Sequence, residues 1–408
     1  MDFQDIDTLR NEDECKEYAV LKLYKMGNMG TALAAYKGVE IEVLGGINQE
    51  LVKARIYRFT RKKKPVIVGI VVEVLQASEY RIQPLCPYYG PCSGCQLQHI
   101  KYEKQLLYKK QLIMDQFSEY SNLEHAIILN TIPSPDQWNY RNHARFTVRF
   151  NGQLGFSNRI TKRFVRVDKC MLMNDGINDV LDELQDLVEE TTSISVRNGI
   201  NTDEILIQPK LYSDRIDLET GQKWYTEILN DKKFRIASPS FFQVNTLQAE
   251  KMILLVGDLL QLTKTDVLVD AYSGVGVFAT LLADRVKKVI AIEESFSAIE
   301  DGESDSSNTG NLQFMMGKTE HVLPEIMETI DALILDPPRV GCHPDVINSI
   351  LKVKPRRIAY VSCDPETLAR DLDKLVAGGY ITKQILPIDM FPQTYHVESI
   401  SLLCLKNS

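Results

Sequence analysis

Three cysteines lie within ten residues in the segment CPYYGPCSGC, at Cys86, Cys92 and Cys95. Thiolates this close together are ligands for soft metals, and the glycines and prolines between them allow the backbone to wrap around a bound centre. A fourth ligand must come from elsewhere, and Cys170 is the nearest candidate along the chain. Four thiolates suit either tetrahedral zinc or a [4Fe–4S] cluster. Reduced structural cysteines without a ligand are the alternative.

A further cysteine, Cys363, ends the apolar segment RRIAYVSCDP and precedes the helical pattern ETLARDL. At the mouth of a parallel sheet, the dipole of the following helix favours the thiolate, which is the nucleophilic form. The segment DALILDPPRVG places Asp336 after another strand, where open parallel sheets bind their ligands. These two segments therefore predict chemistry at strand ends. An inert buried cysteine and a plain Pro-Pro turn are the alternative interpretations.

The segment LVDAYSGVGVFATLLA runs from an apolar strand into a turn with Gly274 and Gly276 and then into a helix. Glycine at such a turn lets a ligand approach the backbone. Glu293 ends the next strand about 20 residues later, where an acid accepts hydrogen bonds from ribose hydroxyls. Ala279 stands where a dinucleotide fingerprint has its third glycine. The pattern thus favours a nucleoside-type cofactor without a pyrophosphate, and an empty tight turn is the alternative.

These residues need elements to position them, and a chain of 408 residues has room for two or three domains. From about residue 24 to 83, short β-rich pieces alternate with turns and predict a small barrel of oligonucleotide-binding type. A helical stretch near 102–118 and strand-like pieces such as ARFTVRF and RFVRV indicate an α+β middle part. From about Phe241 onward, helical patterns alternate with apolar strands, which is typical of a doubly wound parallel sheet.

The net charge is −8, but the bases are concentrated. Residues 51–64 hold seven bases and no acid, and eight bases lie between Trp138 and Cys170 against the single acid Asp168. The second run is interleaved with aromatic residues, which fits a surface that follows a nucleic-acid backbone and stacks its bases. Solvated charged faces are the alternative. The apolar runs are too short to cross a bilayer, and the acidic start is unlike a signal peptide, so we expect a cytoplasmic protein without a membrane partner.

Together these motifs resemble the class I S-adenosylmethionine-dependent RNA uracil carbon-5 methyltransferases, in particular their iron–sulfur branch that acts on 23S ribosomal RNA. The resemblance covers nearly the whole chain. It rests on the segments CPYYGPCSGCQLQH, FFQVN, DAYSGVGVFA, DPPRVG, YVSCDPETLARDL and DMFPQTYHVES. Two positions depart from the family's pattern, because Val277 stands where relatives often have Asn and Lys318 where a polar cofactor contact is expected.

The resemblance implies an α/β protein in three parts: a TRAM/OB-type RNA-binding barrel at 1–83, a central α+β domain with an iron–sulfur loop and a basic face at 84–240, and a Rossmann-like methyltransferase domain at 241–408. It implies Cys363 as nucleophile and Glu398 as base. The implied cofactor contacts are Gln243, Tyr272, Gly274, Glu293 and Asp336, and the implied ligands of a [4Fe–4S] cluster are Cys86, Cys92, Cys95 and Cys170. The expected enzyme is a monomer that acts on ribosomal RNA.

The two catalytic residues have a chemical reason. Carbon-5 of uracil is too weak a nucleophile to attack a sulfonium methyl group, and addition of a thiolate at carbon-6 creates an enolate that can. After methylation, a carboxylate must remove the carbon-5 proton before the thiolate leaves. Three alternatives stay open: an enzyme for the T-loop of transfer RNA, a methyltransferase of the same fold for cytosine or a small molecule, and a non-catalytic RNA-binding protein.

Overall fold

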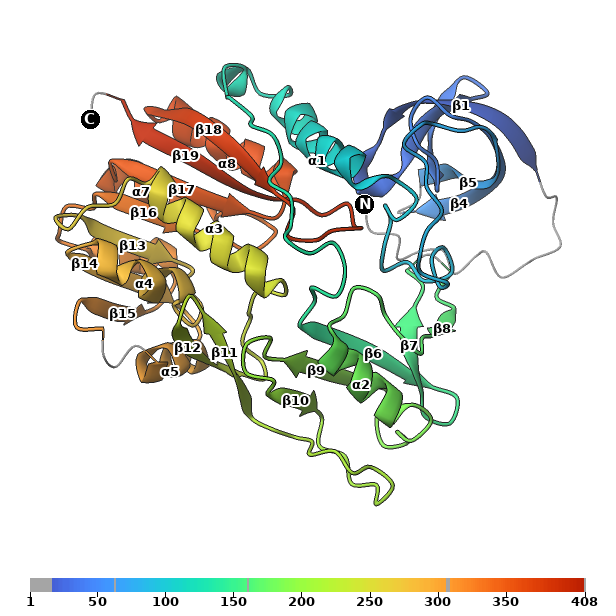
Figure 1. Ribbon diagram of the computed structural model, residues 1–408. Coiled ribbons are helices and arrows are strands. Elements are labelled where there is room, and N and C mark those ends of the chain that lie inside the picture. The colour runs from blue at the N-terminus through green and yellow to red at the C-terminus, as the bar shows by residue number, and fades with distance from the viewer. Residues whose placement is uncertain (1–16, 62–63, 160, 306–308, 407–408) are drawn as a thin grey trace.

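The computed structural model describes residues 17–61, 64–159, 161–305 and 309–406, with the side chains at 60, 61, 64 and 305 left aside. This part of the chain forms a barrel, a small antiparallel sheet and a large sheet flanked by helices (Figure 1). The basic run expected at 51–64 lies partly outside the described residues, which do not include Lys62 and Lys63. None of the described helices is long and apolar enough to cross a membrane.

The N-terminal barrel is closed, as the β-rich pattern predicts, with the strand order β1-β2-β3-β5-β4. Its strands are β1 (Tyr18–Met26), β2 (Ala32–Tyr36), β3 (Val39–Leu44), β4 (Leu51–Arg61) and β5 (Lys64–Gln76). Alternate residues such as Leu21 and Leu23 fill its core, while Val20 and Lys22 face outward. The barrel begins at Tyr18, earlier than expected, because the outward positions of β1 include the apolar Val20 and the aromatic Tyr24, which hide its alternation.

The helix expected near 102–118 is α1 (Tyr102–Phe117). It lies between the barrel and the large sheet in Figure 1, and it packs against α8 (Pro365–Ala377) and β18 (Tyr380–Ile388). Ile113 and Phe117 belong to the core of the large sheet. The helix therefore joins the C-terminal sheet in space although it precedes the central sheet in sequence.

The central antiparallel sheet has the order β10-β9-β6-β7-β8. Its elements are β6 (His143–Arg149), β7 (Gln153–Ser157), β8 (Phe164–Arg166), α2 (Asp175–Leu184), β9 (Ser193–Asn198) and β10 (Ile205–Gln208). The strand-like segments at 144–150 and 163–167 are confirmed as β6 and β8. Two of the expected stacking rings are not available to RNA, since Tyr140 and Phe146 are buried. Phe146 alternates into the core face of β6, and Phe150 at its end is exposed.

The large C-terminal sheet has the order β15-β14-β13-β16-β17-β19-β18. Its strands are β13 (Val267–Ala271), β14 (Lys288–Glu293), β15 (Leu312–Met316), β16 (Ala332–Leu335), β17 (Arg357–Ser362), β18 and β19 (Glu398–Leu405). The helices are α3 (Thr246–Leu259), α4 (Val277–Leu282), α5 (Phe296–Asp305), α6 (Thr319–Val322), α7 (Pro344–Val353) and α8, and a hairpin of β11 (Trp224–Leu229) and β12 (Lys232–Ala237) precedes them. Two hydrophobic cores, one around Leu333 and one around Ile334, pack its two faces.

The sheet differs from the expected parallel arrangement at one edge. Strands β13 to β17 pair in parallel, but β19 runs antiparallel to both β17 and β18. The physical reason is the connection: residues 389–397 join β18 to β19 without a helix, and a parallel return needs a longer crossover. The loop 389–397 therefore stays at the edge where the parallel strands end.

Candidate active site

Cys363 stands at the carboxyl end of β17, in the turn that leads into α8. Asp364 caps this helix, because its Oδ1 accepts the Thr367 N–H at 3.0 Å, and Pro365 occupies the first turn, where a missing N–H costs nothing. Ser362 Oγ closes the turn through hydrogen bonds with the backbone of Asp364. The strand therefore ends sharply and leaves Cys363 at the edge where open α/β sheets bind ligands.

Strand pairing brings Glu398 to Cys363. Ser362 of β17 pairs with Ser399 of β19 in antiparallel register, so the next facing positions are Cys363 and Glu398. The Glu398 side chain is buried. Burial and the negative charge of Asp336 raise the pKa of Glu398 well above its usual range. The two residues expected to act on one base are therefore neighbours, although 34 residues separate them in sequence.

The thiol of Cys363 is protonated at neutral pH. Burial, followed by the charge of Glu398, raises its pKa to about 12. Burial and the charge of Glu398 therefore act against the ionisation that the dipole of α8 favours. The guanidinium of Arg339 acts in the opposite direction and lowers the pKa of Cys363 and of Glu398. Arg339 is thus the cation that favours an anion at this place.

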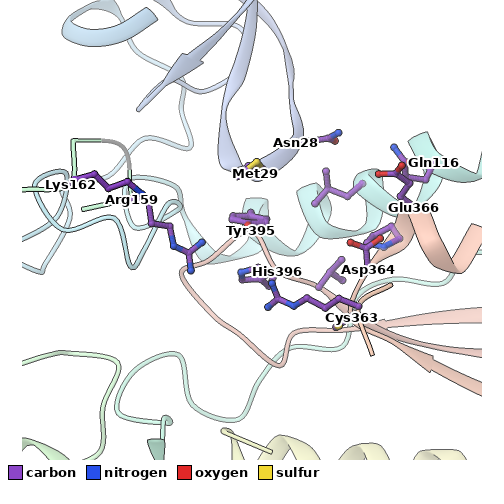
Figure 2. A pocket seen from close by; sticks show the side chains of 14 residues that line it. Asn28, Met29, Gln116, Arg159, Lys162, Cys363, Asp364, Glu366, Tyr395 and His396 are labelled. Atoms are coloured by element: carbon purple, nitrogen blue, oxygen red, sulfur yellow. The ribbon is translucent and has the colours of Figure 1, made fainter. Parts of the chain in front are cut away.

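A cavity of about 510 Å³ opens onto Cys363, which lies within the range of small-ligand pockets. Figure 2 shows its side chains converging from parts of the chain that are far apart in sequence. The lining residues are Asn28 and Met29 of the barrel, Leu112 and Gln116 of α1, Arg159 and Lys162 near the central sheet, and Arg339, Cys363, Asp364, Pro365, Glu366, Tyr395, His396 and Val397 of the C-terminal sheet. The pocket is therefore completed by loops from all three parts of the molecule together with α1 and the start of α8.

The aromatic wall of the pocket comes from the loop 389–397. The rings of Tyr395 and His396 lie 4.1 Å apart between centroids, and Phe391 meets His396 edge-on at 5.9 Å. Burial and the nearby positive charges, Arg339 first, lower the pKa of His396 to about 3. A neutral imidazole with so low a pKa is a weak proton acceptor. Glu398, whose pKa is raised and which lies beside Cys363, is the better proton acceptor.

The tip of the barrel was missed by sequence reasoning. Residues Asn28–Gly30 form a tight turn in which Met29 has a φ of 64°, a left-handed conformation that is uncommon for a residue with a side chain. Tyr108 of α1 holds the turn, since its hydroxyl donates to Gly27 O at 2.9 Å and accepts from Gly30 N at 2.8 Å. The glycines at 27 and 30 indicate a turn, but no local pattern predicts that this turn faces Cys363.

The expected cofactor residues gather along the ends of three neighbouring parallel strands. Ala271 of β13 pairs with Ile292 of β14 and Leu335 of β16, so Tyr272, Glu293 and Asp336 follow at the same edge. Glu293 Oε2 accepts the Gly274 N–H at 2.9 Å. The acid therefore faces the glycine turn, as the spacing predicts. Burial raises the pKa of Asp336 to about 7.

The environment of this edge fits a polar nucleoside ligand. Asp270, which sequence reasoning missed, is buried on β13 and accepts the Ala279 N–H at 3.0 Å through Oδ2. Its Oδ1 finds no hydrogen-bond partner within the described part of the chain, and burial raises its pKa to about 8. A side chain at Gly274 would meet open space, whereas one at Gly276 would stand 2.7 Å from Phe314. The turn is therefore open on one side and packed on the other.

Gln243 and Tyr272 are less directly connected to this edge. Gln243 lies in the segment before α3, and its carbonyl oxygen accepts from Asn142 Nδ2 at 3.0 Å. Tyr272, with a φ of 63°, turns its hydroxyl toward the buried Cys342 thiol. Its backbone rather than its hydroxyl thus borders the glycine turn. The structure brings Gly274, Glu293 and Asp336 together more clearly than Gln243.

The four expected cluster cysteines are free thiols that influence one another. Charges at Cys86 and Cys170 would both raise the pKa of Cys92 and of Cys95, and all four are half-buried without a disulfide. Backbone N–H groups of Leu172 and Met173 donate to Cys170. Among the described residues no group of three or more His, Cys, Asp or Glu side chains could hold a single metal ion. A cluster of four irons holds its thiolates farther apart than one zinc ion does.

The basic run between Trp138 and Cys170 divides into paired and pocket-facing cations. Arg166 is paired with Asp168 at 2.9 Å and Asp186 at 2.8 Å. Arg159 and Lys162 instead line the pocket beside Cys363 (Figure 2). The Arg159 backbone N–H donates to Ser93 Oγ at 2.8 Å, which fixes this loop to the cysteine-rich segment. The cations available to a substrate are therefore fewer than the sequence suggests.

Comparison with known proteins identifies the class to which this fold and pocket belong. An RNA methyltransferase of Halalkalibacterium halodurans, named as uncharacterized, is 30% identical over 93% of this chain and 95% of its own. A similarly named RNA methyltransferase of Caldanaerobacter subterraneus subsp. tengcongensis is also 30% identical, over 96% of this chain and 99% of its own. The chain is thus an RNA methyltransferase.

The family model for tRNA (uracil-5-)-methyltransferases matches residues 206–406, which include Cys363 and Glu398. This chain belongs to the RNA uracil-5-methyltransferase family. The crystal structure of Pyrococcus abyssi tRNA (uracil-54, C5)-methyltransferase in complex with S-adenosyl-L-homocysteine shares its fold, with a TM-score of 0.73 and 24% identity over 95% of this chain and 100% of that chain.

Proposed function

We propose that this protein forms 5-methyluridine in 23S ribosomal RNA, with S-adenosylmethionine as the methyl donor. The observation that carries the proposal is the register of β17 and β19, which sets Cys363 opposite Glu398. Cys363 lines a cavity of about 510 Å³ that cationic side chains also line, and Glu398 is buried close enough to Cys363 for its charge to raise the pKa of the thiol. A thiol and a carboxyl at one base-sized pocket are the pair that carbon-5 methylation of uracil requires.

In this mechanism, the Cys363 thiol first loses its proton to water, and its sulfur then forms a bond to carbon-6 of the uracil. The electron pair of the carbon-5–carbon-6 double bond moves toward the carbon-4 carbonyl as an enolate. Arg339, which lowers the pKa of the thiol, favours its ionised form. S-adenosylmethionine supplies an electrophilic methyl group for carbon-5. Glu398 then takes the proton from carbon-5, the double bond re-forms, and Cys363 leaves as a thiolate. The wall formed by Tyr395 and His396 keeps water from the uracil ring.

The methyl donor is held, in this proposal, at the strand ends of β13, β14 and β16. Glu293 accepts from ribose hydroxyls, and Gly274 lets the ligand approach the backbone. Asp336 lies between this edge and the pocket, and Gln243 and Tyr272 complete the contacts. The unpartnered Oδ1 of Asp270 supports a polar ligand or ordered water nearby.

Cys86, Cys92, Cys95 and Cys170 are proposed to hold a [4Fe–4S] cluster. The N–H groups directed at Cys170 support thiolate there, because such bonds stabilise negative sulfur. The cluster holds the cysteine loop against the central sheet and takes no part in methyl transfer. On this proposal, residues 1–83 and 84–240 bind RNA and 241–408 carry out catalysis, in a monomeric cytoplasmic enzyme.

The experiment that tests the proposal maps 5-methyluridine in ribosomal and transfer RNA from cells with and without the protein. We expect one uridine of 23S ribosomal RNA to lose its methyl group in the deletion strain and to regain it with the wild-type gene but not with Cys363→Ala. Loss confined to the T-loop of transfer RNA would give the enzyme the substrate of its Pyrococcus abyssi structural neighbour. Loss of 5-methylcytidine instead would refute uracil as the target.

A further inference from the structure

The loop 389–397 decides the shape of the pocket without being part of any sheet. It carries Tyr395 and His396 to the cavity beside Cys363 (Figure 2), between the end of β18 and the start of β19. Pairing with β17 and β18 fixes Glu398, but the aromatic wall depends on whatever holds the loop itself.

Gln393 is the residue by which the loop is held. Its side chain is 3% exposed, and its φ of 68° lies in the left-handed region, which costs free energy for a residue with a Cβ unless its surroundings impose it. Its carbonyl oxygen accepts the N–H groups of Gln96 at 3.1 Å and Leu97 at 3.0 Å. Gln96 directly follows Cys95. The end of the cysteine loop (residues 86–100) thus holds the pocket loop (residues 389–397) through main-chain hydrogen bonds, and we call this contact the clamp.

Gln105 of α1 completes the clamp. This side chain is 1% exposed, and its Oε1 accepts the Gln393 N–H at 3.1 Å. Its Nε2 lies 3.0 Å from Gln393 Oε1 and donates to Ile100 O at 2.8 Å and Leu97 O at 3.1 Å. One amide therefore joins the helix, the cysteine loop and the pocket loop.

A second contact from the same helix face supports this arrangement. Lys109, one turn after Gln105, is fully buried and pairs with the buried Asp389. Its Nζ also donates to Phe391 O at 3.0 Å. The first half of the loop is thereby tied to α1 at two successive turns, while Tyr108 between them holds the tip of the barrel.

We propose that Gln105 is a positioning residue for methyl transfer: it sets Gln393, and through it Tyr395 and His396, so that the target base stands over Cys363. The inference rests on the proposed function and adds the clamp to it. Polar groups buried to this extent need their partners, and a displacement of about 1 Å in a reacting geometry can lower a rate on the order of 100-fold.

The main test replaces Gln105 by Met, which keeps the length and removes all four hydrogen bonds. The matched control is Gln111→Met on the exposed side of α1, where the amide contacts Asp115 only across one turn. We expect Gln105→Met to form the covalent complex with RNA carrying 5-fluorouracil about 10- to 100-fold more slowly than wild type. Its KM for S-adenosylmethionine should stay within about twofold of the wild-type value, because the expected cofactor residues lie at the ends of β13, β14 and β16, which Gln105 does not contact in the part of the chain that the structure describes. Gln111→Met should match wild type in both.

Hydrogen exchange separates positioning from general loss of structure. In Gln105→Met, exchange should accelerate in 389–398 while 267–276 and 357–362 keep wild-type protection. Iron content, measured on the same sample, should stay at the wild-type value. Slower trapping together with unchanged exchange in 389–398 would overturn the proposal, as would a wild-type trapping rate.

Gln393→Gly supplies a second variant if Gln105→Met does not yield folded protein. Glycine accepts the φ of 68° and keeps the main-chain bonds, so this change removes the buried side chain of Gln393, and with it the contact to Gln105, but not the backbone clamp. It should trap more slowly than wild type, and the double variant should be no slower than Gln105→Met, because both act through one contact. Independent, multiplying effects would overturn the clamp. If wild type itself transfers no methyl group, the proposed function fails, and the exchange data still decide the positioning.

Discussion

Cysteine thiols occur in two parts of this molecule with similar burial and different neighbours. At the end of β17, Cys363 faces the carboxyl of Glu398, and Arg339 is the cation that lowers its pKa. In the cysteine-rich loop, Cys92, Cys95 and Cys170 have raised pKa values as well, with burial as the main cause. There the neighbours are other thiols, and backbone N–H groups donate to Cys92 and Cys170.

The difference shows that burial alone does not decide whether a cysteine is suited to be a nucleophile or a ligand. The nucleophile must be ionised to attack carbon-6 and leaves again as a thiolate, so a cation beside it favours the reaction, while the carboxyl removes the carbon-5 proton. A ligand thiolate stays ionised, and the fixed N–H donors at Cys92 and Cys170 suit it. The two groups are also physically linked, because Gln96 and Leu97 of the cysteine loop donate to Gln393 of the pocket loop.

Loss of the nucleophile should give the largest effect. Cys363→Ala removes the group that adds to carbon-6, so we expect neither methylated RNA nor a covalent complex with RNA carrying 5-fluorouracil, while the protein keeps its fold and its iron. Denaturing gels and methyl incorporation measure both. Cys404→Ser on β19 is the control, with an expected wild-type result. Methylation by Cys363→Ala would refute the covalent mechanism.

Loss of the base should separate the two catalytic roles at this edge. Glu398→Gln still allows attack by Cys363 and methylation at carbon-5, but no carboxylate removes the proton, so a protein–RNA adduct should accumulate and turnover should fall about 10²- to 10⁴-fold. The adduct survives denaturing gels. If Glu398→Gln turned over rapidly without forming an adduct, another group would be the proton acceptor. The pKa of about 3 makes His396 a poor candidate for that role.

The residues of this edge could be predicted because each belongs to a local pattern. Cys363 and Asp336 end apolar strands, and parallel strands bring their ends to one edge. Glu293 was expected to contact ribose hydroxyls because of its distance from the glycine turn. It does lie at that turn, where it accepts the Gly274 N–H, and the ribose contact stays a prediction. A small barrel was predicted from short β-rich pieces separated by turns, and the structure has a closed barrel of five strands there.

What could not be predicted depends on contacts between distant segments. Gln105 and Gln393 are 288 residues apart, and neither belongs to a periodic pattern that relates them. Asn28 and Met29 reach the pocket because α1 orients the barrel. The antiparallel direction of β19 followed from the short loop before it, whose strand partner β18 was not recognised. Tyr140 and Phe146 were misjudged because aromatic residues fill cores as well as stack on bases.

Removal of one thiol from the cysteine loop should affect structure more than chemistry. Protein purified without oxygen should be brown and hold about four irons per chain, and Cys92→Ser should lose the colour and much of its solubility. Any soluble fraction should still form the 5-fluorouracil adduct, more slowly. Iron, sulfide and zinc analyses measure this, with Cys404→Ser as the control. Stoichiometric zinc without sulfide would contradict the cluster.

Replacement of the cation beside Cys363 should shift the pH dependence. Arg339 lowers the pKa of a thiol that burial and Glu398 raise to about 12, so Arg339→Gln should raise that pKa further. Each unit of increase lowers the thiolate fraction about tenfold at any pH below it. The adduct-forming rate should therefore fall at pH 7 to about 9 and partly recover toward higher pH. Arg356→Gln, at the opposite end of β17, should leave the profile unchanged.

The smallest effect should come from the cations that lie between the two groups of cysteines. Arg159 and Lys162 line the pocket, and the Arg159 N–H is tied to Ser93 in the cysteine loop. Because a phosphate contact releases counterions, Arg159→Ala and Lys162→Ala should each weaken RNA binding similarly for all sequences and reduce the salt slope by about one. Arg215→Ala, whose exposed side chain lies 3.7 Å from Glu189, is the control. Titrations at several salt concentrations measure the slope. An unchanged slope with slower adduct formation would mean that these cations act on the base within the pocket rather than on the RNA backbone.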